Sequence, residues 1–502
     1  MNQQVFLLGG ELHFKLLPLN TGFVTYITDT SEDIPLVSFG DNLASSKIGK
    51  LEHLLLHHYN NDSELVKETE VKWKGRRDHL GLYSLGDKLI WVYNEQEKGD
   101  DALTWVQLLN LDGKLGKRFQ IFKFNPKKGF TYINSTVSND KSKRGFVFSK
   151  MSFNLRAGKG DDGNSELSFM VFNDDGSVVC STNKKLTTSR RNFELKSIGV
   201  TNSGKIIAVA DIYDIDNRKK LKGGSLNQIY TYTLAPESKE VIKTHVQSKG
   251  VYLSDLSLYT NTTGNINLFG IYRKSERKQN IGVFCVTGLS ENSKSINLIP
   301  FNESDLQKLG TRVTHVSKGT LTLKNEFSIQ GALSHNNGSN TILLEAYYRK
   351  VSERTGAITH NFNDGIIINY NNEGNINSAT TIPKVQPNIN QIEPYARMHL
   401  IEHNGKAAVV YNDNIDNLSS DQDQVRKALT NMNKKNAVAT IAYTNEDEKL
   451  VRKPLFPSME IKGMMIIPNS VAELSDGDAI FMTYGGKPTI RNFFALGKLK
   501  TN

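Results

Sequence analysis

Three histidines are the first side chains whose types and spacing could do chemistry. His53 and His57 stand four residues apart in KLEHLLLHHYN, with His58 adjacent. On a strand, residues i and i+4 share one face, so this pair could bind a metal ion. No third ligand follows at a useful spacing, and we therefore predict no metal site here.

Carboxylates are the next candidates. Asp211, Asp214 and Asp216 (DIYDID) could coordinate calcium, but the segment lacks the DxDxDG pattern of calcium-binding loops. Glu345 interrupts the apolar run LLEAYY of an expected strand, so its carboxylate must face water, a central channel or a partner group. Such a carboxylate can be catalytic, yet we favour a structural, hydrogen-bonded role for Glu345.

The common catalytic and cofactor motifs HExxH, CxxC, P-loop and GxSxG do not occur in this sequence. Acidic groups in NDDGS, NLDGK, TNEDEK and SDGDA have the composition of turns. We therefore predict no catalytic residue and no cofactor, and a protein that is not an enzyme. Cys180 and Cys285 lie 105 residues apart in expected strands, and we predict that both are buried thiols.

Composition excludes several classes of protein. The 502 residues are 38% hydrophobic and 23% charged, which is enough apolar material for a sizeable core. The longest apolar runs, such as Ile206–Ala210, are five residues, far short of the roughly 20 that a membrane helix needs. The net charge of +10 suggests nucleic acid, but the basic residues are spread along the chain and no RNP-like aromatic motif accompanies them. We expect no nucleic-acid partner.

Short β-rich apolar runs recur along the chain and must position these side chains. One type follows a tight polar turn, and its central residues, at 24, 91, 147, 208, 269, 344, 410 and 481, are 56 to 75 residues apart. Similar but unequal intervals are typical of a repeat whose loops vary around a constant core. These second strands are Phe23–Ile27, Leu89–Tyr93, Phe146–Phe148, Ile206–Ala210, Leu268–Tyr272, Ile342–Tyr348, Ala407–Tyr411 and Ala479–Tyr484.

After each second strand come a polar loop and a third strand, and most third strands are followed by a hairpin turn and a fourth strand. Eight third strands are followed by only seven hairpins, because the chain ends at ALGKLKTN. The missing fourth strand has a candidate at the other terminus, in Gln3–Leu8. An N-terminal strand that completes the last unit is how a circular array of sheets closes.

We therefore predict one all-β domain, a β-propeller of eight four-stranded blades closed by the N-terminal strand. Seven blades is the alternative, because region 30–75 is the least regular, and a series of β-sandwiches fits less well because nothing like a linker interrupts the period. The expected blades are 11–74, 75–125, 126–188, 189–248, 249–302, 320–390, 391–457, and 458–502 with 2–9. The one expected helix, Asp421–Asn433, is short and lies in a loop.

The loops between second and third strands carry most of the loop length and charge, so the rim that they form is the expected interaction face. They span residues 29–47, 153–166, 214–225, 273–280, 349–364 and 414–435. Six residues of these loops and the neighbouring strands are our candidates for an interaction surface or the channel: Glu345, Asp214, Arg273, Lys274, Arg349 and Lys384.

The stretch from Thr341 to Gln386 resembles large exported propeller proteins of Bacteroidota. These read as an apolar strand with Glu, a Tyr-rich segment, a loop, a second apolar strand, a turn with Gly, and IPK.Q. The matching residues here are Glu345, Tyr347, Tyr348, Asn363, Asp364, Ile382, Pro383, Lys384 and Gln386, followed by YNDN at Tyr411–Asn414 and by Asn417. The chain departs from the pattern at Asn377-Ser378-Ala379, where an aromatic residue usually precedes IPK.

The resemblance, specific over about 340–460, implies a location and a role but no active site. It implies a periplasmic or outer-membrane-associated mature chain, although the N-terminus itself reads as no signal peptide and also allows a cytoplasmic protein. It implies a non-catalytic interaction or scaffold subunit that docks on, or occludes, an outer-membrane assembly such as the type IX secretion translocon. The alternative is a polysaccharide-binding or carbohydrate-active propeller.

Overall fold

The computed structural model describes most of the chain. The described residues are 3–4, 11–31, 36–39, 42–45, 50–97, 101–126, 129–152, 164–189, 193–212, 227–261, 263–274, 280–289, 296–317, 320–324, 326–335, 339–352, 354–371, 375–389, 395–403, 405–418, 427–430, 436–445, 449–455, 465–473, 478–485 and 493–499.

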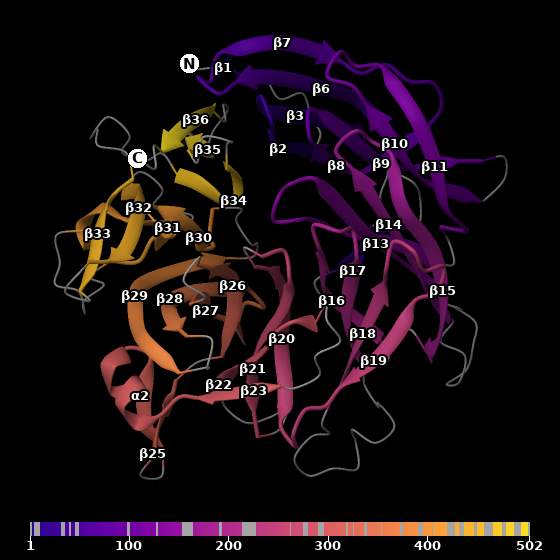
Figure 1. Cartoon of the computed structure of the whole chain (residues 1–502). Coiled ribbons are helices and arrows are strands. Elements are labelled where there is room, and N and C mark those ends of the chain that lie inside the picture. The colour runs from indigo at the N-terminus through magenta and orange to yellow at the C-terminus, as the bar shows by residue number, and fades with distance from the viewer. Residues whose placement is uncertain are drawn as a thin grey trace.

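Eight four-stranded antiparallel sheets follow one another around a ring (Figure 1). Blade 1 contains β2 (Glu11–Leu19), β3 (Gly22–Ser31), β6 (Lys50–Asn60) and β7 (Leu65–Glu70). Blade 2 contains β8 (Arg77–Leu85), β9 (Lys88–Gln96), β10 (Ala102–Leu109) and β11 (Leu115–Phe124). Blade 3 contains β12 (Gly129–Val137), β13 (Lys143–Ser152), β14 (Asn164–Asn173) and β15 (Val178–Ser189). Blade 4 contains β16 (Phe193–Val200), β17 (Ile206–Ile212), β18 (Gln228–Leu234) and β19 (Ile242–Val246).

The second half of the ring repeats this order. Blade 5 contains β20 (Tyr252–Thr260), β21 (Ile266–Arg273), β22 (Asn280–Val286) and β23 (Asn297–Pro300). Blade 6 contains β26 (Phe327–Ser334), β27 (Asn340–Val351), β28 (Ile358–Tyr370) and β29 (Ile376–Ile389). Blade 7 contains β30 (His399–His403), β31 (Lys406–Asn414), β32 (Ala437–Thr444) and β33 (Leu450–Pro454). Blade 8 contains β34 (Met465–Glu473), β35 (Ala479–Gly485), β36 (Phe493–Leu499) and β1 (Gln3–Gln4).

Blade 8 is built from both ends of the chain. In β1, Gln3 pairs with Phe494 and Gln4 pairs with Phe493 of β36, and the two termini lie near each other (Figure 1). This pairing supplies the fourth strand of the sheet formed by β34, β35 and β36. The predicted eight-bladed propeller, closed by an N-terminal strand, is therefore confirmed, and the seven-bladed alternative is wrong.

Deleting residues 2–9 is expected to open the ring, because the free edge of β36 then faces water with unpaired backbone groups. We expect a lower midpoint and a broader transition in calorimetry. A chain carrying alanines in place of Gln3 and Gln4, which keep the backbone pairing, is the control. Unchanged unfolding of the truncated chain would contradict closure by β1.

Apolar contacts between neighbouring blades form the core. The second strands are buried on both faces, and in β17 the six residues Ile206–Asp211 are all buried. Sheets buried on both faces need continuous rather than alternating apolar runs, which explains why these strands were visible in the sequence. Buried clusters connect each neighbouring pair of blades around the ring, and Leu16, Phe23, Tyr59 and Ile480 join blade 1 to blade 8.

Three short elements were not expected from the sequence. The hairpin of β4 (Leu36–Phe39) and β5 (Asn42–Ser45) lies between β3 and β6. Helix α2 (Glu303–Leu309) and the hairpin of β24 (Thr314–Ser317) and β25 (Thr320–Leu323) lie between blades 5 and 6. Asn302 and Asp305 form a capping box at the start of α2. Leu306 and Leu309 then pack into the core that blades 5 and 6 share.

The helix predicted at 421–433 is wrong where the structure describes it. Residues 427–430 are not helical, and the rest of that prediction, 421–426 and 431–433, lies outside the described residues. The Leu429 side chain is buried with Tyr395, Ala437 and Met465, and its N–H donates to the carbonyl of Val385 in β29. Tertiary contacts therefore hold residues 427–430 in a non-helical conformation despite their helical spacing.

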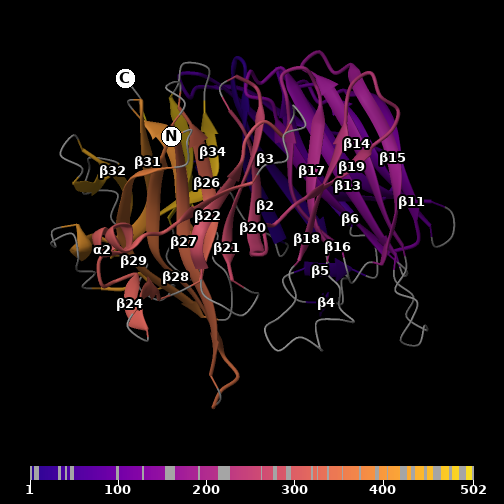
Figure 2. The same ribbon diagram turned by 60° about the horizontal axis from the view of Figure 1, so that its bottom comes forward.

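The segment predicted as a polar loop at 349–364 is instead a two-stranded extension of blade 6. Strands β27 and β28 stay paired as far as Val351 and Ile358, and a hairpin turn closes where Ser352 N donates to the carbonyl of Ala357. Figure 2 shows this hairpin projecting beyond the rest of the ring. We call residues 347–362 the arm. Charged residues hid the arm in the sequence because Tyr348–Val351 are exposed and need no apolar run.

Candidate functional site

Glu345 and Lys384 form a buried ion pair in blade 6. The Lys384 Nζ donates to Glu345 Oε1 at 2.7 Å, and the two side chains are 1% and 0% exposed. Burial raises the pKa of the Glu345 carboxyl and lowers the pKa of the Lys384 amine, while their mutual attraction opposes both shifts. The carboxylate of β27 therefore faces neither water nor the channel but a lysine that lies 39 residues further along the chain.

Polar side chains of β29 hold the connection from blade 6 to blade 7. Lys384 and Gln386 alternate along β29 and so point the same way. Lys384 Nζ also donates to the carbonyl of Ala396, and Gln386 Nε2 donates to the carbonyl of Tyr395 at 3.4 Å. A buried connection without a strand partner must satisfy its backbone groups elsewhere, and these side chains do so.

Asn412, in β31 of blade 7, continues this network to blade 8. Its Nδ2 donates to the carbonyls of Tyr395 and Ile466, both at 2.8 Å, and its Oδ1 accepts from Ile466 N at 2.8 Å. Asn227 makes the same contact between blades 4 and 5, because its amide bonds to both the N–H and the carbonyl of Leu253. One amide side chain thus fixes a neighbouring blade by imitating a strand partner.

Two further ion pairs flank this network. Arg312 Nη2 donates to Asp364 Oδ1 at 2.6 Å, and the same oxygen accepts from Lys384 N at 2.8 Å. In blade 7, Arg452 Nη1 lies 3.6 Å from Asp413 Oδ2, and both side chains are almost fully buried. Burial raises the pKa of the Asp413 carboxyl, which accepts hydrogen bonds from neighbouring groups.

These contacts give structural roles to several of the residues that carry the resemblance to the Bacteroidota propellers. Asn417 Nδ2 donates to Asp413 Oδ1 at 2.7 Å and to the carbonyl of Lys427 at 2.8 Å, so it holds the segment 427–430 against blade 7. The network joins blades through buried charges and amides that already contact protein groups. Arg312 and Arg452 were missed, because no local pattern marks a partner that lies tens of residues away.

The other predicted site residues do not join this cluster. Arg273 Nη1 pairs with Glu326 at 3.2 Å, and its guanidinium lies over the Tyr252 ring at 5.6 Å. Lys274 is exposed beside it, and Arg349 is exposed on the arm. Asp214 lies outside the described residues. Of the five candidates that the structure describes, it therefore brings together only Glu345 and Lys384.

Three of the residues of the possible metal sites, His53, His57 and Asp211, have protein partners. His53 Nδ1 lies 3.2 Å from Glu70 Oε1, and His57 Nε2 lies 3.1 Å from Glu68 Oε2, both across the β6–β7 pair. Asp211 Oδ2 accepts from the Asn227 amide at 2.9 Å, whereas Asp216 lies outside the described residues. Within the described ranges, three or more His, Cys, Asp or Glu side chains nowhere gather as a metal ion would require.

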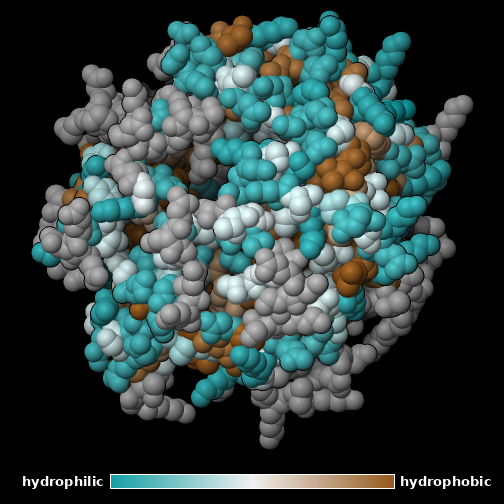
Figure 3. All heavy atoms as spheres, in the orientation of Figure 1, coloured by the Kyte–Doolittle hydropathy of each residue, from teal (hydrophilic) through white to brown (hydrophobic). Residues whose placement is uncertain are grey.

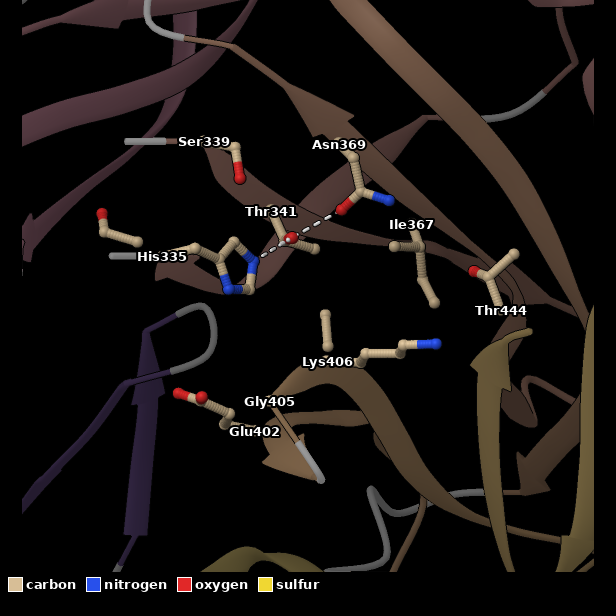
Figure 4. A pocket seen from close by; sticks show the side chains of 11 residues that line it. His335, Ser339, Thr341, Ile367, Asn369, Glu402, Gly405, Lys406 and Thr444 are labelled. Carbon is tan, nitrogen blue, oxygen red and sulfur yellow. Dashed lines mark hydrogen bonds between the residues drawn. The ribbon is translucent and has the colours of Figure 1, made fainter. Parts of the chain in front are cut away.

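A cleft of about 440 Å³ opens between blades 6 and 7 at the rim of the tight turns (Figure 4). On its wall His335 Nε2 lies 2.8 Å from Thr341 Oγ1, Thr341 donates to Asn369 Oδ1 at 2.5 Å, and Asn369 donates to Ser378. Because the Thr341 proton goes to Asn369, His335 must be the donor to Thr341. This direction is opposite to that of a nucleophile and its base.

A smaller cavity of about 240 Å³ lies near the ring axis, where residues of blades 1, 2, 3, 7 and 8 meet. Arg144 and His399 contribute to its lining. Burial lowers the pKa of His399 to about 4 and that of Arg144 to about 10. His399 is therefore neutral near pH 7.

The His399 shift predicts how stability depends on pH. As pH falls below 6.5, the unfolded chain takes up a proton at this position while the folded chain does so only near pH 4, so stability falls across this interval, by up to roughly 3 kcal/mol. Burial raises the pKa of Asp78 to about 6, and this carboxyl acts in the opposite direction. Denaturant unfolding of H399N and the unmodified chain at several pH values isolates the histidine, because Asp78 is common to both. Parallel pH profiles would contradict the prediction.

Both cysteines are buried free thiols, as predicted. Burial raises the pKa of Cys180 to about 11 and of Cys285 to about 12. Both thiols therefore stay protonated and unreactive near neutral pH.

The arm exposes several large side chains of blade 6. Tyr348 and Val351 are 41% and 52% exposed, and Ile389, at the end of β29 beside the arm, is 40% exposed. The face of the molecule shown in Figure 3 is largely hydrophilic, with its apolar residues in separate groups. Exposed Arg349 and Lys350 interleave with the apolar side chains of the arm.

The sheets and their closure define an eight-bladed β-propeller. No protein-family model matches the chain, and no curated protein matches it. Among solved structures, a prolyl endopeptidase is similar at a TM-score of 0.39 and 11% identity over 94% of this chain, which spans only 55% of that longer chain. The WD40 domain of SCAP from fission yeast is similar at 0.38 and 11% identity, covering 96% of this chain and 97% of that one.

A variant of the apocarotenoid oxygenase of Synechocystis is similar at a TM-score of 0.30 and 11% identity, over 74% of this chain and 89% of that one. Because these TM-scores are all below 0.5, the assignment of the fold as a propeller rests on the sheets of this chain itself. No helix within the described ranges is long and apolar enough to cross a membrane.

Proposed function

We propose that this propeller is a non-catalytic interaction subunit of a bacterial cell envelope, where it docks on an outer-membrane assembly such as the type IX secretion translocon. The projecting arm carries the proposal, because it presents Tyr348, Val351 and two cations outside the disc. Large exposed aromatic and basic side chains are enriched where proteins bind proteins.

The buried network supports the same proposal. The buried side chains of Glu345 and Lys384 pair within blade 6, and those of Asp413 and Arg452 lie together within blade 7. Lys384 also donates to the carbonyl of Ala396, in the connection between these two blades. They hold the blade that bears the arm in a fixed position relative to its neighbour. A rigid support lowers the entropy that binding would otherwise cost. The resemblance of this region to exported Bacteroidota propellers supports the envelope location.

The test is crosslinking and affinity purification from envelopes of the native host, with the tagged chain at its natural expression level. We expect a stoichiometric complex with an outer-membrane protein. A matched variant replaces residues 349–360 by Asn-Gly, a two-residue turn that suits the facing pair Tyr348 and Asn361. This variant should fold but lose the complex. Recovery of the full chain only as a monomer, or from the cytoplasm, would contradict the proposal.

A further inference from the structure

We propose that the outer edge of β27 in the arm, residues Tyr348–Val351, binds an extended acidic segment of another protein by strand addition. The inference depends on the proposed function, since it specifies the chemistry of the partner that the arm would hold.

The edge is open from Tyr348 onward. Strand β26 pairs with β27 only as far as Phe327 and Ala346, whereas β28 follows β27 to Val351. Among the residues that the structure describes, no strand pairs with the other side of Tyr348–Val351. An open edge is a template for another strand.

The direction of the backbone groups follows from the turn. Ser352 N donates to the carbonyl of Ala357, across the pair that follows Val351 and Ile358. In an antiparallel pair, successive residues turn their N–H and C=O alternately toward and away from the partner. Lys350 therefore faces β28, while Arg349 and Val351 turn their N–H and C=O outward. These two residues offer an incoming strand donors and acceptors at the normal spacing.

The side chains add apolar contact on both faces of the arm. Val351 stands opposite Ile358 on one face, and Tyr348 lies on the other. Ile389 of β29 lies opposite Thr359 and so shares the face of Lys350 and Tyr348. An added strand would cover Tyr348 with one side chain and Val351 with another, which is the alternation that strand addition uses.

The positive charge of the arm indicates which kind of segment would pair with β27. Arg349, Lys350 and Arg354 are exposed, and the sequence between 347 and 362 contains only one acidic residue, Glu353. An acidic strand would place its carboxylates near these cations. A second copy of this arm would instead place like charges opposite one another, which is unfavourable. The partner is therefore an acidic segment and not another copy of the chain.

The experiment titrates the full chain with a fluorescent peptide that alternates glutamate and valine, and with its lysine–valine counterpart. We expect binding of the acidic peptide only. V351P removes an outward N–H while sparing the β27–β28 pairing, since proline is tolerated on an open edge, and should weaken binding about tenfold. R349Q should weaken binding less, and K67E, a charge change on the outer strand β7 of blade 1, should have no effect.

Hydrogen exchange of the unmodified chain is the second measurement, in case V351P disturbs the arm. We expect the amides of Arg349 and Val351 to become protected when the acidic peptide binds, and the Lys350 amide to change little. Absence of binding, equal binding of the lysine peptide, binding without this protection, or dimerisation through the arm would each overturn the inference. If the peptide fails but the envelope complex forms, only strand addition is wrong; if the peptide binds and the complex does not form, the envelope function is wrong.

Discussion

Replacing Lys384 with methionine is expected to destabilise the propeller by about 3–5 kcal/mol, which is the usual cost of leaving one member of a buried ion pair without its partner. Methionine has nearly the length of lysine, so little packing is lost. The Glu345 carboxylate, 0% exposed, would then have to stay charged without the ammonium group or take up a proton. The carbonyl of Ala396 would also lose its donor.

Equilibrium unfolding in denaturant, monitored by tryptophan fluorescence and circular dichroism, measures this loss. K350M makes the same replacement on the exposed arm and should change stability by less than about 0.5 kcal/mol. Combining K384M with E345L removes both charges and should recover at least half of the loss, because no charge is then left buried. A loss below about 1 kcal/mol for K384M, or no recovery in the double variant, would show that the pair contributes little.

The Asn412 contacts predict an effect of similar size. N412L preserves the shape of the side chain but removes all three hydrogen bonds to Tyr395 and Ile466. Each buried backbone group left without a partner costs about 1–3 kcal/mol, so we expect a loss of at least 3 kcal/mol. N412D keeps an acceptor for Ile466 N but turns an oxygen toward the two carbonyls, and should also destabilise the chain.

Comparison with two other asparagines makes this test specific. N227L removes the equivalent amide between blades 4 and 5 and should cost a comparable amount. N139L, in the exposed turn between β12 and β13, should cost much less. Thermal unfolding of all four variants gives the ranking. If N412L and N139L are equally stable, side-chain amides do not fix neighbouring blades.

The sequence predicted the repeat well because its signal is physical and local. Second strands are buried on both faces and must be apolar throughout, as in Ile206–Ala210, and the turns need residues that reach positive φ. The count of strands then predicted that Gln3–Leu8 would complete the last blade, and Gln3 and Gln4 do so, whereas residues 5–8 lie outside the described residues. The short helix α2 was missed, since only a capping box marks its seven residues.

The candidate site was predictable only in part. Glu345 was noticeable because a carboxylate in an apolar strand needs a partner. Its partner Lys384, however, lies in β29, which is separated from β27 by β28 in the folded sheet. The segment 349–364 read as a charged loop, because an exposed hairpin and a loop have the same composition. Its pairing to Val351 and Ile358 depends on backbone geometry that no residue pattern specifies.

Sequence alone therefore determined the all-β class, the eight repeats, the closure by the N-terminal strand and the burial of both thiols. Each of these features follows from which residues must be buried away from solvent. Tertiary structure alone decided which charges meet, which amides replace a strand partner between blades, and which edge of β27 stays open. Those contacts join residues far apart in the chain, and only the relative position of neighbouring blades brings them within hydrogen-bonding distance.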